Sequence, residues 1–281
     1  VSRLYMSNKC LLIADHKSVD KQIHIFNKND FSYLTSIGNF GEGPEEITVM
    51  GCLAIDEAHH QLYVSDHAKQ KIFSYDMDSV MVDSLYKPQV KTAMNETLFP
   101  SEYQYINDTL SIAVLIKPTS TSTFNQFLGR WNMNTGEMIP MKYTHPDIQK
   151  KRITFAASEK AGIYVECYTR HDLMTICSLD GELLYNIYGP DWDGGNGNKL
   201  QSFGTVMIGN DKIFVSYCGE DYARDSFPTK ILVFDLEGNY LKTLETGYKI
   251  SDCCYDSFNN RIILSLNDVV QFAYLDIDGI I

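Results

Sequence analysis

The sequence predicts a six-bladed β-propeller, an all-β fold of repeated four-stranded antiparallel blades. One pattern of four short apolar segments separated by polar turns recurs six times along the chain, and no segment keeps a 3.6-residue period. Six units in 281 residues give roughly 47 residues each, a length typical of propeller blades rather than of helical solenoids.

The clearest copy of the repeat lies between residues 49 and 86. Apolar segments at residues 52–56, 61–66 and 71–76 are separated by polar turns, and the fourth strand is expected at residues 81–86. Each segment is short and partly alternating, as is typical of strands in an antiparallel meander.

The same alignment places the second and third strands of all six units. The second strands are expected at residues 10–15, 62–66, 110–116, 163–168, 213–218 and 262–267. The third strands are expected at residues 22–26, 71–75, 127–133, 173–179, 230–236 and 269–275. A turn rich in Asn, Asp or Gly follows each third strand, and these residues tolerate the left-handed backbone of a hairpin.

A blade buries its faces only against its neighbours, so residues 1–281 are expected to form one domain without an internal boundary. The predicted blades span residues 1–38, 39–90, 91–145, 146–190, 191–247 and 248–281. The sixth unit stops at Gly279, where its fourth strand should begin, so the last blade is predicted to lack a strand. A longer chain, or residues near its start, would then supply the strand that closes the ring.

Charge and hydropathy limit the classes of partner that we expect. With 36 acidic and 24 basic residues the net charge is −12, and the basic residues are scattered, so we expect no nucleic-acid partner. No apolar stretch approaches the roughly 20 residues that span a bilayer, and we expect no transmembrane segment; any export signal would already be absent from this sequence. The seven cysteines show no C-x-x-C spacing and are expected to be buried free thiols.

The segment IGNFGEGPEEI at residues 37–47, followed by LAID at 53–56, LYVSD at 62–66 and KIFSYD at 71–76, resembles an NHL-type propeller repeat. The chain is similar to the TolB-like or NHL-like six-bladed propellers of bacteria, most closely over residues 37–76. The resemblance implies an exported protein, periplasmic or anchored at the surface as a lipoprotein. It implies no single activity, because that scaffold hosts binding platforms and lactonase-like enzymes alike.

Three histidines, His16, His67 and His171, are each expected in the loop after a second strand, in the first, second and fourth units. These loops share one rim of a propeller. Three imidazoles there would suit a transition metal or proton transfer; alternatively they are polar loop residues beside capping carboxylates. No particular metal or cofactor is predicted.

Two loops on that rim are unusually long, at residues 117–126 and 218–230. Insertions in a repeat generally map to the face that carries the function, although variable surface loops are an open alternative. The predicted ligand-binding residues are His16, His67, Lys117, Tyr168, Arg170, His171, Tyr217, Glu220, Asp221, Tyr222 and Arg224.

Two glycine-rich loops are weaker candidates. The loop at residues 38–46 lacks the following helix and the Lys-Ser/Thr ending of a phosphate loop, so an inter-blade crossing is expected there. In the loop at residues 189–198, Asp191 and Asp193 would suit calcium or simply shape a turn. Trp192 would stack on a flat ligand or pack between blades.

The sequence lacks the G-x-S-x-G and H-E-x-x-H signatures of hydrolases. It therefore favours a non-enzymatic binding or interaction module whose rim loops hold a small molecule, a glycan or a protein segment. The alternative is a metal-dependent propeller hydrolase or lactonase, which requires the three histidines to converge with carboxylates. A third reading is a scaffold whose outer edges bind partners.

Overall fold

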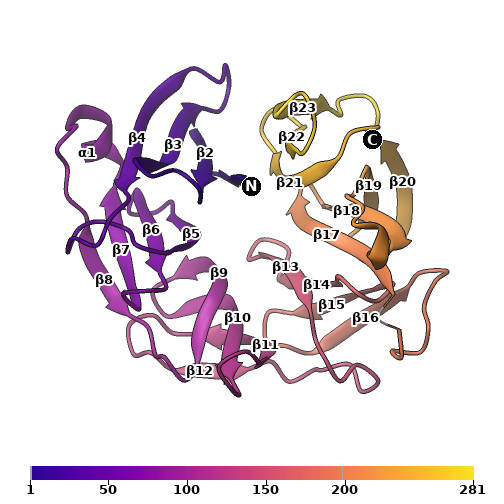
Figure 1. Cartoon of the computed structure of the whole chain (residues 1–281). Helices are drawn as coiled ribbons and strands as arrows, with labels where there is room; N and C mark the ends of the chain where they lie inside the picture. The colour runs from indigo at the N-terminus through magenta and orange to yellow at the C-terminus, as the bar shows by residue number, and fades with distance from the viewer. Residues whose placement is uncertain (1, 198) are drawn as a thin grey trace. The chain divides into compact units, whose positions relative to one another are not determined.

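A computed structural model describes residues 2–197 and 199–281, and these residues form six antiparallel sheets (Figure 1). The chain divides into two compact units, one ending at Pro140 and the other beginning at Met141, with three sheets in each.

The sheets of the first unit run in chain order. The first contains β1 (Ser2–Met6), β2 (Cys10–Asp15), β3 (Lys21–Asn27) and β4 (Tyr33–Asn39). The second contains β5 (Met50–Asp56), β6 (Gln61–Asp66), β7 (Lys71–Asp76) and β8 (Gln89–Ala93). The third contains β9 (Phe99–Asn107), β10 (Leu110–Pro118), β11 (Phe124–Trp131) and β12 (Met138–Pro140).

The second unit repeats this order. Its first sheet contains β13 (Ile153–Ser158), β14 (Ile163–Tyr168), β15 (Leu173–Ser178) and β16 (Leu183–Tyr188). Its second contains β17 (Leu200–Gly209), β18 (Lys212–Asp221), β19 (Lys230–Asp235) and β20 (Tyr240–Glu245). Its third contains β21 (Ile250–Asp256), β22 (Arg261–Leu266) and β23 (Phe272–Asp276).

The core of each unit lies between successive sheets. Leu12 and Ile25 of the first sheet pack in one cluster with Leu53, Val64 and Phe73 of the second. Clusters of the same kind join the second and third sheets, the fourth and fifth, and the fifth and sixth. Fully burying such a side chain contributes about 1.5–3 kcal/mol, which is why the central strands read as near-continuous apolar runs.

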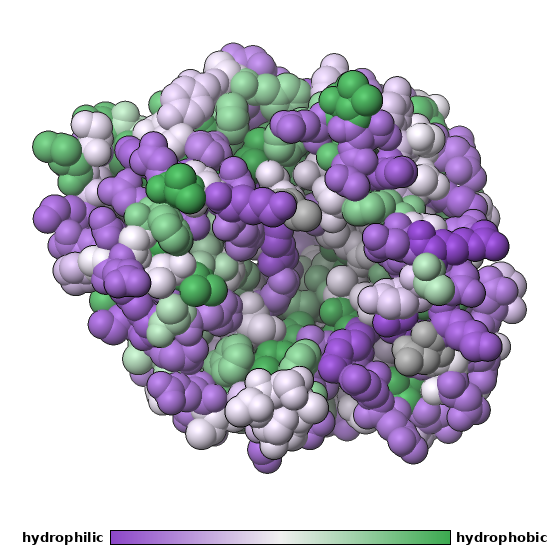
Figure 2. Space-filling view, in the orientation of Figure 1, coloured by the Kyte–Doolittle hydropathy of each residue, from purple (hydrophilic) through white to green (hydrophobic). Residues whose placement is uncertain are grey.

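The outer strands are more exposed, and Figure 2 shows hydrophobic residues interspersed with hydrophilic ones over the visible face. No helix within the described ranges has the length and apolarity needed to cross a membrane.

The prediction of a fourth strand at residues 81–86 is wrong. Helix α1 (Met77–Val82) occupies part of this segment, and the fourth strand is β8, which crosses the blade boundary expected at residue 90. Asp76 caps the helix by accepting a 2.8 Å hydrogen bond from the Ser79 amide, and Val80 is buried beneath it. Local capping and one buried side chain therefore override the partial alternation of the sequence.

The two long rim loops are shorter than predicted because strand pairing continues into them. Lys117 lies in β10 opposite Asn125 of β11, which leaves a connection of only residues 119–123. Likewise, β18 runs on to Asp221 and is followed by the short 3-10 helix η1 (Tyr222–Arg224).

The sixth sheet has three strands among the described residues, as the sequence predicts. Its last turn copies that of the fifth sheet: Asp276 accepts a hydrogen bond from the Asp278 amide at 3.0 Å, and Asp235 accepts one from the Glu237 amide at 2.9 Å. That all six sheets form one continuous domain stays a prediction.

Candidate functional site

A cleft of about 410 Å³ opens in the second unit. Three segments line it: residues 147–152 before β13, Arg170 and His171 after β14, and residues 195–197 before β17. Two of the predicted ligand-binding residues, Arg170 and His171, therefore share this cleft.

The cleft gathers positive charge in an acidic protein. Lys150, Arg152 and Arg170 line it, and among the described residues Asp147 is the only carboxylate in the lining. The whole chain carries a net charge of −12. A concave site lined by one sign of charge concentrates oppositely charged ligands.

A buried ion pair holds the basic segment in place. Lys151 turns inward and donates a 2.5 Å hydrogen bond to Glu166 Oε1 on β14, and both side chains are buried. Tyr168 donates to the other carboxylate oxygen at 3.3 Å. The two neighbours of Lys151 in sequence, Lys150 and Arg152, line the cleft. Arg152 also donates to the Lys151 carbonyl at 2.7 Å, which limits its freedom.

Arg170 is positioned by an aromatic ring from the segment between β18 and β19. Its guanidinium carbon lies 3.1 Å from the centre of the Tyr222 ring, a cation–π contact. Tyr222 belongs to η1, whose N-cap Asp221 accepts a 2.9 Å hydrogen bond from the Ala223 amide. The structure thus brings together two predicted residues that lie in different rim loops.

Two other charged residues of this loop pair with each other. Arg224 of η1 and Glu220 of β18, four residues apart in sequence, form an exposed ion pair at 3.1 Å. Exposed pairs of this kind contribute about 0–1 kcal/mol.

His171 is the buried residue of the cleft lining. The side chain is buried, and within the described part of the chain its Nδ1 atom has no hydrogen-bond partner. The nearest carboxylate oxygen, Asp193 Oδ1, is 3.7 Å away. The ring lies beside Tyr168 and Trp192, each with 6.2 Å between ring centres.

Trp192 packs into an aromatic cluster. Its ring centre lies 4.9 Å from that of Tyr188 and 5.4 Å from that of His145. His145 Nε2 hydrogen-bonds the Tyr188 hydroxyl at 2.9 Å, and burial lowers the pKa of this imidazole. Trp192 therefore lies in direct contact with one wall of the cleft.

The glycine-rich loop at residues 189–198 contributes residues 195–197 to the lining. Gly195 has a φ of +80°, and a Cβ atom there would lie 2.5 Å from the Asp147 carbonyl oxygen. Asp193 accepts a 3.1 Å hydrogen bond from the Gly195 amide, as in an Asx turn. The loop at residues 189–198, for which calcium binding and a turn were the two alternatives, also includes Asn198, which lies outside the described residues.

Across residues 2–197 and 199–281, no group of three or more His, Cys, Asp and Glu side chains is arranged to hold a metal ion.

Tyr217 and Glu220 line a neighbouring cavity of about 460 Å³ in the same unit. Tyr217 donates a 3.2 Å hydrogen bond to Asp172, which also accepts one from the Asp191 amide at 3.0 Å. Burial raises the pKa values of both the Asp172 carboxyl and the Tyr217 hydroxyl. These groups support the loops beside the cleft.

The other predicted residues lie in the first unit. His16 and His67 both contact Gly51 on β5: the His16 ring hydrogen-bonds its backbone, and a Cβ atom at Gly51 would lie 2.2 Å from His67 Nε2. Burial lowers the pKa of both imidazoles. Lys117 is exposed on β10. The structure therefore brings His16 and His67 together, whereas His171 belongs to the second unit.

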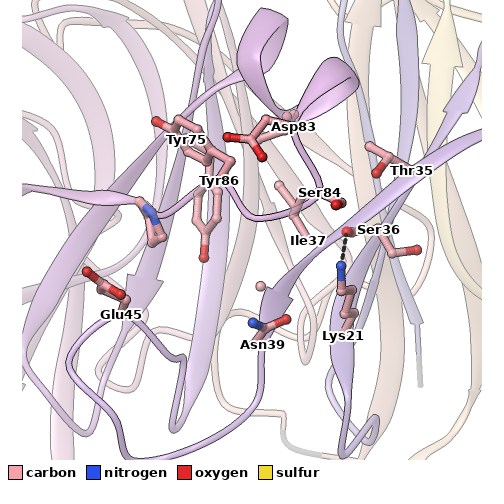
Figure 3. Close-up of a pocket in the computed structure, with 13 residues that line it drawn as sticks. Lys21, Thr35, Ser36, Ile37, Asn39, Glu45, Tyr75, Asp83, Ser84 and Tyr86 are labelled. Carbon is pink, nitrogen blue, oxygen red and sulfur yellow. Dashed lines mark hydrogen bonds between the residues drawn. The ribbon is translucent and has the colours of Figure 1, made fainter.

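The same unit has a small hollow of about 40 Å³ between β4 and the segment that follows α1 (Figure 3). Lys21 of β3 lines it and donates a 3.2 Å hydrogen bond to the Ser36 carbonyl of the neighbouring strand β4. Its volume is close to that of a single water molecule, so it is too small for a ligand.

Sequence reasoning missed the residues that give the cleft its charge, Lys150 and Arg152. The sequence does mark this segment, because Lys150, Lys151 and Arg152 form its one run of three consecutive basic residues.

The family model DUF5128, described as a 6-bladed beta-propeller, matches residues 1–128. Solved structures resemble the chain over nearly its whole length. A member of the duf4221 family from Bacteroides vulgatus is 9% identical, with 98% of this chain and 92% of that chain covered at a TM-score of 0.63. The chain is a six-bladed β-propeller.

Other propellers show the same likeness. The Swd1 β-propeller domain of Myceliophteria thermophila is 9% identical, with 98% of this chain and 96% of that chain covered at a TM-score of 0.59. The WD40 repeats of RRP9 are 11% identical, with coverage of 94% and 72% and a TM-score of 0.57. At such identities the likeness concerns the fold alone. No curated protein matches the chain in sequence.

Proposed function

We propose that this propeller is a binding module, and that the cleft of its second unit binds a small molecule with two or more closely spaced negative charges. The observation that carries the proposal is that three basic side chains, Lys150, Arg152 and Arg170, line one cleft. Asp147 is the single carboxylate beside them in the described lining, although the chain as a whole has a net charge of −12.

The chemistry of these side chains favours an anion with several oxygen atoms. Each guanidinium presents a planar fork of donors that matches a carboxylate or a phosphate group, and Lys150 adds a mobile point charge. The Tyr222 ring and the Lys151 carbonyl restrict the two arginines. Less conformational freedom is then lost when a ligand binds.

The glycine-rich loop allows a ligand to approach its backbone closely, because Gly195 and Gly197 place no side chain in the cleft. The volume of about 410 Å³ falls within the range of small-molecule sites, about 300–1,000 Å³. A small molecule therefore fits this cleft better than a flat protein surface does.

Tryptophan fluorescence provides the test. The chain has two tryptophans, and a Trp131→Phe background leaves Trp192, which contacts the cleft residue His171. Inorganic pyrophosphate and citrate should both change its emission in a saturable way. A charge-assisted hydrogen bond contributes about 1.5–3 kcal/mol, so Arg152→Gln or Arg170→Gln should weaken binding about 10- to 100-fold.

Lys160→Gln is the matched control, since it removes one positive charge from an exposed turn of the same unit outside the cleft. It should leave the affinity within about twofold, because an exposed charge at a distance is screened by salt. Equal losses in Lys160→Gln and Arg170→Gln would mean that only the overall charge matters, and would refute the proposed site.

A further inference from the structure

A second cavity, of about 520 Å³, lies in the first unit between its first and second sheets. The turn between β1 and β2, the turn between β5 and β6, and helix α1 all contribute to its lining. It is separate from the basic cleft, which is built wholly from residues of the second unit.

Helix α1, which is labelled in Figure 1, contributes to the wall of this cavity. Within the described residues, the second sheet is the one with an α-helix between its third and fourth strands. The helix supplies Met77, Asp78 and Met81 to the cavity wall. Insertions into a repeat map to loops on one face, which is often the binding face.

The floor of the cavity is apolar. Leu12 and Leu62 are fully buried at its base, and Ile55, Met77 and Met81 pack partly buried against the same core. Methionine side chains are flexible and polarizable, so they adapt to apolar ligands of different shapes. Leu34 of β4 is 42% exposed at the edge and leaves apolar surface for a ligand to cover.

The mouth of the cavity is acidic. Exposed Glu57 and Asp78 line it beside a single lysine, Lys9, and a third carboxylate of the lining, Asp56, is buried. Burial of Asp56 opposes its ionisation, but hydrogen bonds from His59 and Tyr63 outweigh this effect and lower the pKa of the carboxyl.

The other two carboxylates have exposed or backbone partners. Glu57 accepts a 2.7 Å hydrogen bond from the Asn8 amide, and Asp78 lies 3.1 Å from His60 Nδ1. Both side chains remain at the rim, where a positively charged group can approach them.

We propose that this cavity binds a small amphipathic cation, with its alkyl or aryl body on the methionine and leucine floor and one ammonium group at the acidic mouth. The apolar body gains affinity by leaving water, and the ammonium group is selected by the excess of carboxylates. This site is independent of the anion cleft, so either can fail in experiment without the other.

Three eight-carbon probes separate the contributions of body and charge: octylammonium, octanoate and 1-octanol. Isothermal titration of the whole protein at 0.15 M salt should give one octylammonium site, with 1-octanol weaker and octanoate weakest. The Glu57→Gln/Asp78→Asn double variant should reduce the preference for octylammonium over 1-octanol by about tenfold. Equal affinity for all three probes would overturn the proposed selection by charge.

Leu34→Trp should fill the cavity and weaken octylammonium at least about tenfold. Its control is Leu241→Trp on β20, an exposed leucine (46%) that also follows a tyrosine at the start of a fourth strand. Thermal unfolding checks that both variants fold. Absence of octylammonium binding to the wild type, or equal binding to the two folded variants, would overturn the proposal.

Discussion

The buried pair of Lys151 and Glu166 offers a quantitative test of how the basic segment is held. The side chains are 9% and 2% exposed, and the contacting atoms are 2.5 Å apart. Lys151→Met keeps the length of the side chain but leaves the Glu166 carboxylate buried without its partner. Removing one member of a buried pair costs about 3–5 kcal/mol, so we expect the free energy of unfolding of the second unit to fall by about this amount.

Equilibrium unfolding in urea, followed by Trp192 emission in the Trp131→Phe background, measures this change, because Trp192 belongs to the second unit. The double variant Lys151→Met/Glu166→Gln removes both charges and should recover more than half of the loss, since a neutral amide needs no counter-ion. A loss below about 1 kcal/mol in Lys151→Met would place the pair among solvent-screened surface contacts and refute the reasoning.

Three further results are expected. Burial raises the pKa of every one of the seven cysteines, to about 11 for Cys52 and Cys177, so a thiol reagent at pH 8 should label fewer than one site in the folded chain and all seven after denaturation. Gly195→Ala should destabilise the second unit more than Gly162→Ala, although both glycines have a positive φ. The added methyl group at residue 195 would lie 2.5 Å from the Asp147 carbonyl oxygen, whereas a methyl group at residue 162 would have no atom within 4 Å. Each variant loses about 1–2 kcal/mol to the left-handed backbone, and equal urea midpoints would contradict the steric contact. Burial raises the pKa of the Asp172 carboxyl above its ordinary value of 3.8. The contribution of this carboxyl to stability is therefore complete below pH 3.8 and is lost as the pH rises through the raised pKa. Asp172→Asn should remove this loss, and an unchanged pH profile of thermal unfolding in that variant would contradict the assignment.

Most of the fold could be predicted from the sequence because the hydrophobic pattern of a short segment is enough to indicate each strand. The second strands begin and end within a few residues of their expected positions, since short apolar runs bounded by turn residues are typical of buried strands. Helix α1 was missed because a cap at Asp76 and one buried valine decide a six-residue helix. The loop at residues 117–126 was overestimated because pairing of Pro118 with Phe124 depends on contact between strands, not on composition.

The candidate site could be predicted only in part. Arg170 and Tyr222 were found because both lie in rim loops, but their stacking joins segments 52 residues apart and has no sequence signature. Lys150 and Arg152 precede a first strand, where the repeat pattern indicates only a boundary. Their placement depends on Lys151 turning inward toward Glu166, a buried pairing that linear spacing does not reveal.

The central claim, that the cleft of the second unit binds a multivalent anion, is tested most directly by calorimetric titration of pyrophosphate into the wild type and the Lys150→Gln/Arg152→Gln/Arg170→Gln variant. The wild type should bind one pyrophosphate per chain, with an affinity that falls as salt is raised. The variant, with its fold verified by thermal unfolding, should give no measurable heat of binding. Undiminished binding by the folded variant, or no binding by the wild type at low salt, would contradict the claim.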